Sequence, residues 1–229
     1  MKNRLSLSKP RAGLRQALIA TAVSMLCIGS AQAAISSTFD TGTDGWAMRD
    51  ISGSGSGVPT WSAGAIESAD INGWNSFAAP AKFLGNLSGA YGGTLSFDMY
   101  DQYRDSNAND YFTVLIASGN TVLYWYGGAP STTSFTSFSA RLDETDTRWR
   151  MNGSGASPTT GTAVTKAVFQ SVLGNVSRLQ FDADWNTGSD VARLDNVVIA
   201  AVPEPETFAL LMAGLGLVGA VARRKSSKG

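Results

Sequence analysis

The sequence predicts an all-β domain that folds as an antiparallel β-sandwich, and three observations support this prediction. No helical periodicity runs through the central part of the 229-residue chain. Short stretches rich in β-branched and aromatic residues occur there instead. Gly, Ser, Asn and Asp separate these stretches, as turns between strands require. The stretches are numerous enough for two sheets, which favours a sandwich over a single open sheet.

The clearest strands are those in which apolar and polar residues alternate. Residues 93–100 alternate as a half-buried strand does. Leu179, Phe181 and Ala183 repeat the pattern against Gln180, Asp182 and Asp184, which predicts that the three polar residues lie on a solvated face. Residues 111–117 and 121–126 are joined through Ser118-Gly119-Asn120, which predicts an antiparallel hairpin. Further candidate strands are residues 46–51, 76–79, 134–142, 148–151 and 191–200.

One short helix is predicted after this series of strands. Thr165 can cap residues 166–173, and Gly174 can end them. We expect this helix to lie across a sheet edge or an end of the sandwich. The Ser-Gly repeat at residues 52–57 predicts a flexible loop, because it lacks the Lys-Ser/Thr ending of a phosphate-binding loop.

The first 33 residues have the features of a signal peptide. A basic region reaches Arg15, an apolar run follows at residues 17–29, and Ala31-Gln32-Ala33 is a small-x-small cleavage site. We therefore expect signal peptidase to cleave after Ala33. Retention as a membrane anchor is the alternative, although the run is shorter than the roughly 20 residues that a span needs. The predicted domain then covers residues 34–201.

Residues 202–229 form a second apolar end. Pro203-Glu204-Pro205 is followed by an apolar run at residues 208–222 and by Arg223-Arg224-Lys225, which the positive-inside rule places in the cytoplasm. A run of this length reaches about 22 Å as a helix, short of the roughly 30 Å hydrocarbon core. The tail is therefore either a processing signal, with transient anchoring in the inner membrane, or a permanent membrane-spanning helix.

The charge and composition of the domain exclude several functions. Residues 34–201 carry 9 Lys and Arg against 16 Asp and Glu, a net charge of −7 that argues against nucleic acid as a partner. The chain has no histidine, and its one cysteine, Cys27, lies in the segment to be removed. Ser-His-Asp and Cys-His catalysis are therefore excluded.

Carboxylates remain as candidate catalytic or metal-binding groups. Asp182 and Asp184 would lie about 7 Å apart on one strand face, a separation that glycoside hydrolysis can use. The competing interpretation is an ordinary solvated strand face. Oxygen-bearing side chains at residues 105–110 suggest either a loose calcium site or a solvated hairpin connection, and they depart from the EF-hand pattern.

Aromatic residues in polar surroundings are the candidate ligand contacts. Sugars commonly stack on aromatic faces, and most aromatic residues of the domain are expected in the core. Trp74, in the Asn72-Gly73-Trp74-Asn75 segment, and Tyr103, beside charged residues, are the two least explained by burial. Both are predicted to contact a ligand.

The C-terminal segment resembles a known sorting signal. Pro203-Glu204-Pro205, an apolar stretch with Gly214, Gly216 and Gly219, and Arg223-Arg224-Lys225 together resemble the PEP-CTERM tail over about the last 27 residues. That resemblance implies processing by an exosortase-type enzyme. It also implies a Gram-negative bacterium that makes exopolysaccharide, with the protein on its outer surface or in its matrix.

The domain itself resembles the laminin B (laminin domain IV) module over nearly its whole length. The stretches that carry the resemblance are Phe39 with Gly45-Trp46, Pro59-Thr60-Trp61, residues 77–85, residues 91–98, Leu142-Asp143-Glu144, Phe169 with Leu173, and residues 192–197. The resemblance implies a jelly-roll sandwich similar to carbohydrate-binding modules. Such jelly rolls often hold a structural calcium ion between their first and last strands, which implies Asp40 and Asp195 as its ligands together with backbone carbonyls. The alternative is that Asp195 only orders a bulge in its strand; no other cofactor is expected.

These observations favour a non-enzymatic, exported surface or matrix protein that binds polysaccharide, such as exopolysaccharide, or a surface partner. Two alternatives stay open. One is a glycoside hydrolase that uses carboxylates alone, and the other is a structural biofilm component without a defined ligand.

Overall fold

The computed structural model describes residues 33–68, 73–104, 111–153, 155, 157, 159–185, 190–201 and 212–216, without the side chains of Tyr103, Arg104 and Asp190. Gln32–Val202 form one compact unit, and Met1–Ala31 with Pro203–Gly229 form the other. The sorting residues Pro203, Glu204, Pro205, Arg223, Arg224 and Lys225, the cleavage-site residue Ala31 and the oxygen-rich segment 105–110 lie outside the described residues.

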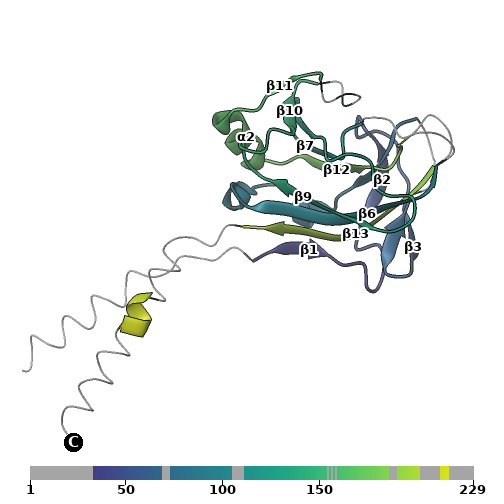
Figure 1. The fold of residues 1–229 in the computed structure, drawn as a ribbon, viewed down its shortest axis with the longest axis horizontal. Coiled ribbons are helices and arrows are strands. Elements are labelled where there is room, and N and C mark those ends of the chain that lie inside the picture. The colour runs from purple at the N-terminus through teal and green to yellow at the C-terminus, as the bar shows by residue number, and fades with distance from the viewer. Residues whose placement is uncertain are drawn as a thin grey trace, which may run out of the picture. The chain divides into compact units, whose positions relative to one another are not determined.

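Gln32–Val202 fold as two antiparallel sheets packed face to face, which confirms the predicted jelly-roll-like sandwich (Figure 1). Sheet A has the order β3 (Thr60–Ser62), β4 (Ala65–Glu67), β13 (Asp190–Ala200), β6 (Thr94–Arg104) and β9 (Thr136–Arg141), and β1 (Ile35–Ser37) also pairs with β13. Sheet B has the order β11 (Thr162–Ala163), β10 (Trp149–Met151), β8 (Thr121–Trp125), β7 (Val114–Ser118), β12 (Arg178–Asp182), β5 (Asn75–Ala78) and β2 (Ala47–Asp50).

Aromatic side chains fill the space between the sheets. Phe97 of sheet A packs edge-on against Phe181 of sheet B, with 4.8 Å between ring centroids, and stacks on Phe138 at 5.2 Å. Trp46, Trp125, Trp149 and Trp185 are fully buried. Burial of such large rings is the main stabilising contribution that this cysteine-poor chain has for its core.

The predicted hairpin and the predicted helix are both confirmed. Strands β7 and β8 pair antiparallel from Val114↔Trp125 to Ser118↔Thr121. Helix α2 (Lys166–Leu173) begins after Thr165, whose Oγ1 accepts a hydrogen bond from the Val168 N–H at 3.4 Å, and Gly174 follows it. The helix packs against β7 and the short 3-10 helix η2 (Ser88–Ala90), and a second such helix, η1 (Ala81–Phe83), precedes η2.

One prediction for β12 is wrong: its polar residues are not solvated. Gln180 is 1% exposed and Asp182 is fully buried, although they alternate with Leu179 and Phe181 as on a wet face. The outer face of sheet B is covered at this point by segments from earlier in the chain. The Gln180 side chain donates to the Asp50 carbonyl at 3.1 Å, and the Trp74 indole donates to Asp182 at 2.8 Å.

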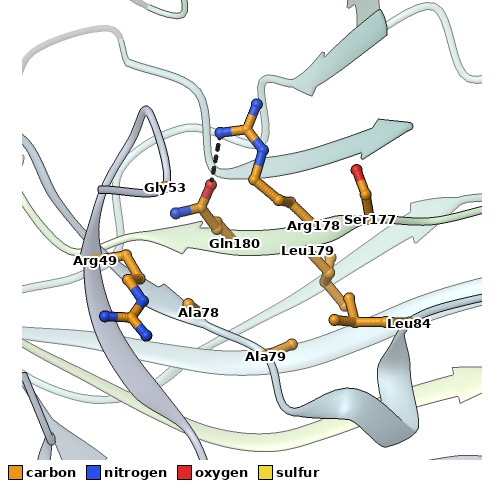
Figure 2. Close-up of a pocket in the computed structure, with 9 residues that line it drawn as sticks. All are labelled: Arg49, Gly53, Ala78, Ala79, Leu84, Ser177, Arg178, Leu179 and Gln180. Carbon is orange, nitrogen blue, oxygen red and sulfur yellow. Dashed lines mark hydrogen bonds between the residues drawn. The ribbon is translucent and has the colours of Figure 1, made fainter. Parts of the chain in front are cut away.

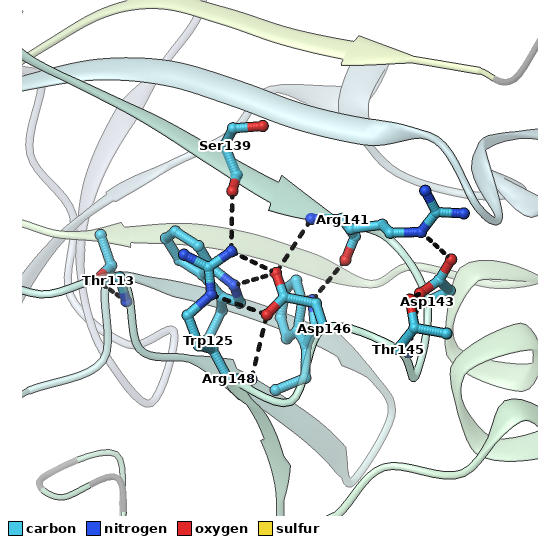
Figure 3. Close-up of polar contacts among 10 residues, drawn as sticks. Thr113, Trp125, Ser139, Arg141, Asp143, Thr145, Asp146 and Arg148 are labelled. Atoms are coloured by element: carbon cyan, nitrogen blue, oxygen red, sulfur yellow. Dashed lines mark hydrogen bonds and ion pairs between the residues drawn. The ribbon is translucent and has the colours of Figure 1, made fainter.

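A polar cluster around Asp146 joins the two sheets (Figure 3). The Asp146 carboxylate accepts hydrogen bonds from the Trp125 indole in β8 at 2.9 Å and from the Arg141 N–H in β9 at 3.3 Å. Arg148 donates to the same carboxylate from Nε and Nη2, both at 2.8 Å, and its guanidinium lies 4.4 Å from the Trp125 ring centroid. These groups serve as hydrogen-bond partners for one another, so the cluster has a structural role.

The first and last strands of the domain lie side by side. In the register of β1 and β13, Ile35 is opposite Ile199. Ala33 and Ala201 line the same small hollow, together with Ile35 and Ile199. Both points at which the domain continues into the terminal segments are therefore at one end of the sandwich.

Within the described ranges, no helix is long and apolar enough to cross a membrane. The described part of the apolar tail, Met212–Gly216, is helical. The rest of the predicted apolar run at residues 208–222 lies outside the described residues, so a membrane-spanning helix there stays a prediction.

Candidate functional site

A pocket of about 170 Å³ opens on the outer face of sheet B (Figure 2). Three neighbouring strands build it: β2 contributes Arg49, β5 contributes Ala78, and β12 contributes Arg178 and Gln180. Its other lining residues are Gly53, Ala79, Leu84, Ser177 and Leu179. Because Ala78 is the direct register partner of Gln180, a methyl group occupies the position where a longer side chain would fill the hollow.

A hydrogen-bond network around Gln180 fixes the polar part of the pocket. The Gln180 amide nitrogen donates to Ser76 Oγ at 2.9 Å and to the Asp50 carbonyl, while its Oε1 accepts from Arg178 Nη1 at 3.4 Å. Ser76 Oγ in turn donates to the Arg49 carbonyl at 2.9 Å. The buried amide therefore has partners on both sides, as buried polar groups require, and it holds β2, β5 and β12 in a fixed arrangement.

The two arginines of the pocket are held by the loop after β2. Arg178 Nη1 donates to the Ile51 carbonyl at 2.9 Å, and Arg49 Nη1 donates to the Gly55 carbonyl. Figure 2 shows the two guanidinium groups on either side of Gln180. A guanidinium has five N–H donors, and no carboxylate among the described residues forms an ion pair with either arginine. Both arginines thus keep donors for a ligand.

The loop of residues 52–57, predicted to be flexible, is held against β2 by backbone hydrogen bonds. The Asp50 N–H donates to the Ser54 carbonyl at 2.9 Å, and Met48 and Gly57 exchange two backbone hydrogen bonds. Gly53 has a φ of +86°, and a Cβ at this position would approach Arg178 Cδ to 3.1 Å. Glycine at this position therefore allows both the turn and the close approach of Arg178.

Trp74, the first predicted ligand contact, lies on the same face as the pocket. Its half-buried ring lies 4.4 Å from Tyr111 and 5.6 Å from Phe112 between centroids, and its carbonyl accepts from the Ile51 N–H at 3.1 Å. It belongs to a small second apolar cluster that also contains Ile51, Phe112, Leu115, Ala117, Val122, Tyr124 and Tyr126. Ile51 thus links Trp74 to the pocket, and ligand contact by Trp74 stays a prediction.

Tyr103, the second predicted contact, belongs to the other sheet. Its backbone pairs with Val191 in sheet A, and its side chain is outside the described part of the chain. The structure therefore does not place Tyr103 and Trp74 in one site.

The predicted calcium ligands Asp40 and Asp195 lie near a third carboxylate. Asp195 is the register partner of Asp98, and Asn196, at a bulge with φ +51°, donates to Asp98 Oδ2 at 2.8 Å. Burial raises the pKa of Asp195, and the negative charges of Asp98 and Asp40 raise it further, although the Asn196 N–H opposes them. Carboxylate and amide oxygens are donors that calcium accepts.

The described residues include no three Asp, Glu, His or Cys side chains arranged closely enough to hold an ion. Calcium at Asp40 and Asp195 therefore stays a prediction.

The candidate catalytic pair Asp182 and Asp184 does not form an open site. Asp182 is fully buried and accepts from the Trp74 indole, and Asp184 Oδ2 accepts from the Asn75 N–H at 3.3 Å. A general acid for glycoside hydrolysis must reach the glycosidic oxygen. The Trp74 ring would have to move before Asp182 could do so.

Sequence reasoning missed Arg49 and Arg178 as candidate binding residues. Their only signal in the sequence is position. Arg178 lies two residues before Gln180 in a strand that alternates, so both belong to the same face, and Arg49 lies next to Asp50 at the end of β2. Nothing in the sequence places β2 beside β5 and β12, so the pocket emerges only from the fold.

Comparisons with known proteins give a consistent result. The model of the Laminin B (Domain IV) family matches residues 76–207, and that of the PEP-CTERM protein-sorting motif matches residues 201–225. The chain is 30% identical over 181 residues to the human laminin subunit gamma-1; the match covers 76% of this chain but 10% of that protein. The chain thus corresponds to about a tenth of that relative's length.

Two solved structures are similar to the fold. The L4b domain of human laminin alpha-2 matches with a TM-score of 0.61 at 16% identity, covering 74% of this chain and 98% of that domain. The solution structure of CtCBM11 matches with a TM-score of 0.42 at 15% identity, covering 77% of this chain and all of that one.

Proposed function

The chain belongs to the laminin B (domain IV) family, and we propose that it is a non-enzymatic surface protein that binds polysaccharide through the outer face of sheet B. The PEP-CTERM match and the laminin B domain indicate an exported, cell-surface bacterial protein.

The pocket around Arg178 is the observation that supports polysaccharide binding. It combines charged donors, Arg49 and Arg178, with an apolar floor of Ala78, Ala79 and Leu84. A sugar ring presents oxygen acceptors at its edge and C–H groups on its faces, so it can use both parts of such a lining. Ligand pockets likewise combine placed polar groups with apolar surface in one concavity.

The two ends of the chain supply the route to the surface. We propose that signal peptidase removes residues 1–33 and that an exosortase-type enzyme processes the tail at or near Pro203-Glu204-Pro205, with Arg223-Arg224-Lys225 retaining the far end in the inner membrane beforehand. The proposed final location is the outer surface or extracellular matrix of a Gram-negative bacterium. The adjacent positions of β1 and the end of β13 allow both cuts without disturbing the sandwich.

Affinity electrophoresis tests polysaccharide binding. The protein is expressed from its full sequence, purified from the exported fraction, and run through native gels containing dextran, galactan or polygalacturonate. We expect at least one polymer to retard it. The double variant Arg49→Gln/Arg178→Gln should run freely, and Arg141→Gln, an exposed arginine on sheet A, should be retarded like the wild type. Free migration of the wild type in every gel would contradict the proposal and favour a structural component without a ligand.

A further inference from the structure

We infer that the pocket between Arg49 and Arg178 receives an acidic sugar, a uronate-type unit whose carboxylate is bound by a guanidinium. The inference rests on the proposed polysaccharide-binding function and narrows it from sugars in general to carboxylate-bearing ones.

The charge of the lining is the first reason. Two of the nine lining residues are arginines, and none is Asp or Glu, in a domain whose net charge is −7. Guanidinium groups bind carboxylates through charge-assisted hydrogen bonds that are about twice as strong as neutral ones. The pocket is thus a local positive site on a negatively charged domain.

The hydrogen-bonding inventory is the second reason. Gln180 donates both of its amide N–H groups within the protein, and the Ser177 hydroxyl donates to the Ala117 carbonyl at 3.1 Å. The side-chain donors that remain in the pocket are therefore those of the two arginines. A carboxylate accepts hydrogen bonds and donates none, so it matches this excess of donors better than a hydroxyl group, which both donates and accepts.

The shape and the floor are the third reason. A volume of about 170 Å³ has room for one sugar ring, and Ala78, Ala79 and Leu84 offer it an apolar surface. The arginines lie at opposite sides of Gln180, so they flank a ring seated between them (Figure 2). A single ring held at its carboxylate fits this geometry.

The overall negative charge of the domain provides no long-range attraction for an acidic polymer. A polyanion is repelled at long range, but this repulsion is largely screened beyond a distance on the order of 8 Å at physiological ionic strength. Binding of an acidic polymer should therefore depend on contact with the two arginines and not on general attraction.

Titration calorimetry of the exported full-sequence protein tests the inference with three matched trisaccharides. Trigalacturonate, its methyl ester and the neutral galactose trisaccharide share a ring but differ in charge. We expect trigalacturonate to bind at least about 10-fold more tightly than either neutral ligand, because a charge-assisted hydrogen bond to a carboxylate is about twice as strong as a neutral one. This comparison needs no variant, so no folding defect can obscure it.

Variants then locate the site. Arg49→Gln and Arg178→Gln should each weaken trigalacturonate binding by about 10-fold, and Ala78→Leu should abolish it by filling the pocket while leaving both charges in place. Arg141→Gln should bind like the wild type. Melting curves identify any variant that fails to fold; Arg178 also supports the loop, so Ala78→Leu provides the independent evidence.

The outcomes separate this inference from the proposed function. Equal binding of neutral and acidic ligands, lost in Ala78→Leu, would overturn the acidic-sugar inference and leave polysaccharide binding intact. Binding of trigalacturonate that is unchanged in all three pocket variants would also overturn it. Absence of binding to all three trisaccharides, together with free migration in every polysaccharide gel, would overturn both.

Discussion

Asp98 in β6 and Asp195 in β13 face each other directly across two hydrogen-bonded strands, and the side-chain amide of Asn196 donates one hydrogen bond to each carboxylate. Like charges in such register destabilise a sheet by roughly 0.2–1 kcal/mol. Burial is the main cause of the raised pKa of Asp195, and the same repulsion raises this pKa further. A carboxyl group with a raised pKa reduces stability while it is ionised, and this cost disappears as the pH falls through that pKa.

Asp195→Asn should therefore stabilise the protein at neutral pH in the presence of EDTA. We expect the melting temperature to rise by about 1–2 °C at pH 7 and the difference to vanish near pH 3, where Asp195 is protonated. Differential scanning calorimetry at the two pH values measures this. A variant that melts below the wild type at pH 7 in EDTA would show that the carboxylate pair is not repulsive.

If Asp40 and Asp195 bind calcium, added calcium should make the wild type more stable than Asp195→Asn, the reverse of their order in EDTA. Added calcium then raises the melting temperature of the wild type, because binding to the folded state stabilises it by mass action, and it has little effect on Asp195→Asn or Asp40→Asn. Magnesium serves as the control for simple screening of the carboxylates. An identical wild-type transition in excess calcium and in excess EDTA would rule out this ion site.

Gly127→Ala should disrupt the cluster around Asp146. A Cβ at this position would lie 2.1 Å from Cζ3 of the Trp125 ring, which is fully buried. Such overpacking typically costs about 1–3 kcal/mol, which corresponds to roughly 2–10 °C in melting temperature for a domain of this size. Gly174→Ala is the matched control, because the nearest atom to its added Cβ would be the Gln170 carbonyl oxygen at 3.3 Å. Equal melting temperatures for the two variants would contradict the packing described for Trp125.

Acid should unfold the domain in part through Asp146. Burial raises the pKa of Asp146, but hydrogen bonds from Arg148 and Trp125 lower it, and the net shift is downward. A lowered pKa in the folded state contributes stability that is present above about pH 4 and is lost as the pH falls below it. Asp146→Asn should cost about 2 kcal/mol at neutral pH and show a smaller further loss between about pH 5 and pH 3. Chemical denaturation across this range provides the test, and parallel pH profiles for the two proteins would refute it.

The Thr165 cap should contribute measurably to α2. Thr165→Ala removes the acceptor for the Val168 N–H, and loss of such a cap costs about 1 kcal/mol. Thr165→Ser keeps the hydroxyl group and should retain most of this stability. Urea denaturation of both variants measures the difference. Equal midpoints for Thr165→Ala and the wild type would show that the 3.4 Å hydrogen bond does not stabilise the protein.

Signal processing should leave the domain intact. Cleavage after Ala33 produces an N-terminus at Ala34, directly before β1, which begins at Ile35. Mass spectrometry of the exported protein should therefore find Ala34 as the first residue. A mature protein that begins beyond Ser37 would lack β1, which is inconsistent with a sheet in which Ile35 pairs with Ile199.

Much of the fold could be predicted from the sequence, because strand alternation, tight turns and helix caps depend on residues that are close together in the chain. The alternation of residues 93–100 predicted the core of β6, the Gly119-Asn120 turn predicted the β7–β8 hairpin, and Thr165 with Gly174 predicted both ends of α2. Strands β1, β3 and β4 were missed. Each has three residues, too few for a period of two to stand out, although β10, which is equally short, was predicted.

Non-local contacts account for the errors and for the pocket. Gln180 and Asp182 were expected in water because alternation specifies only opposite faces, not what covers each face. Their cover comes from Asp50 and Trp74, which lie far earlier in the chain. For the same reason, Arg49 and Arg178 could not be paired before the order β12-β5-β2 was known.

NMR mapping of the bound saccharide tests the central claim most directly. In a titration of the isotope-labelled exported protein with trigalacturonate, we expect the largest amide shifts at Gly53, Ala78, Arg178 and Gln180, with little change at Tyr100 and Arg193 on the outer face of sheet A. Shifts confined to the pocket on sheet B would support binding there. Shifts centred on sheet A, or a spectrum that the saccharide leaves unchanged, would contradict it.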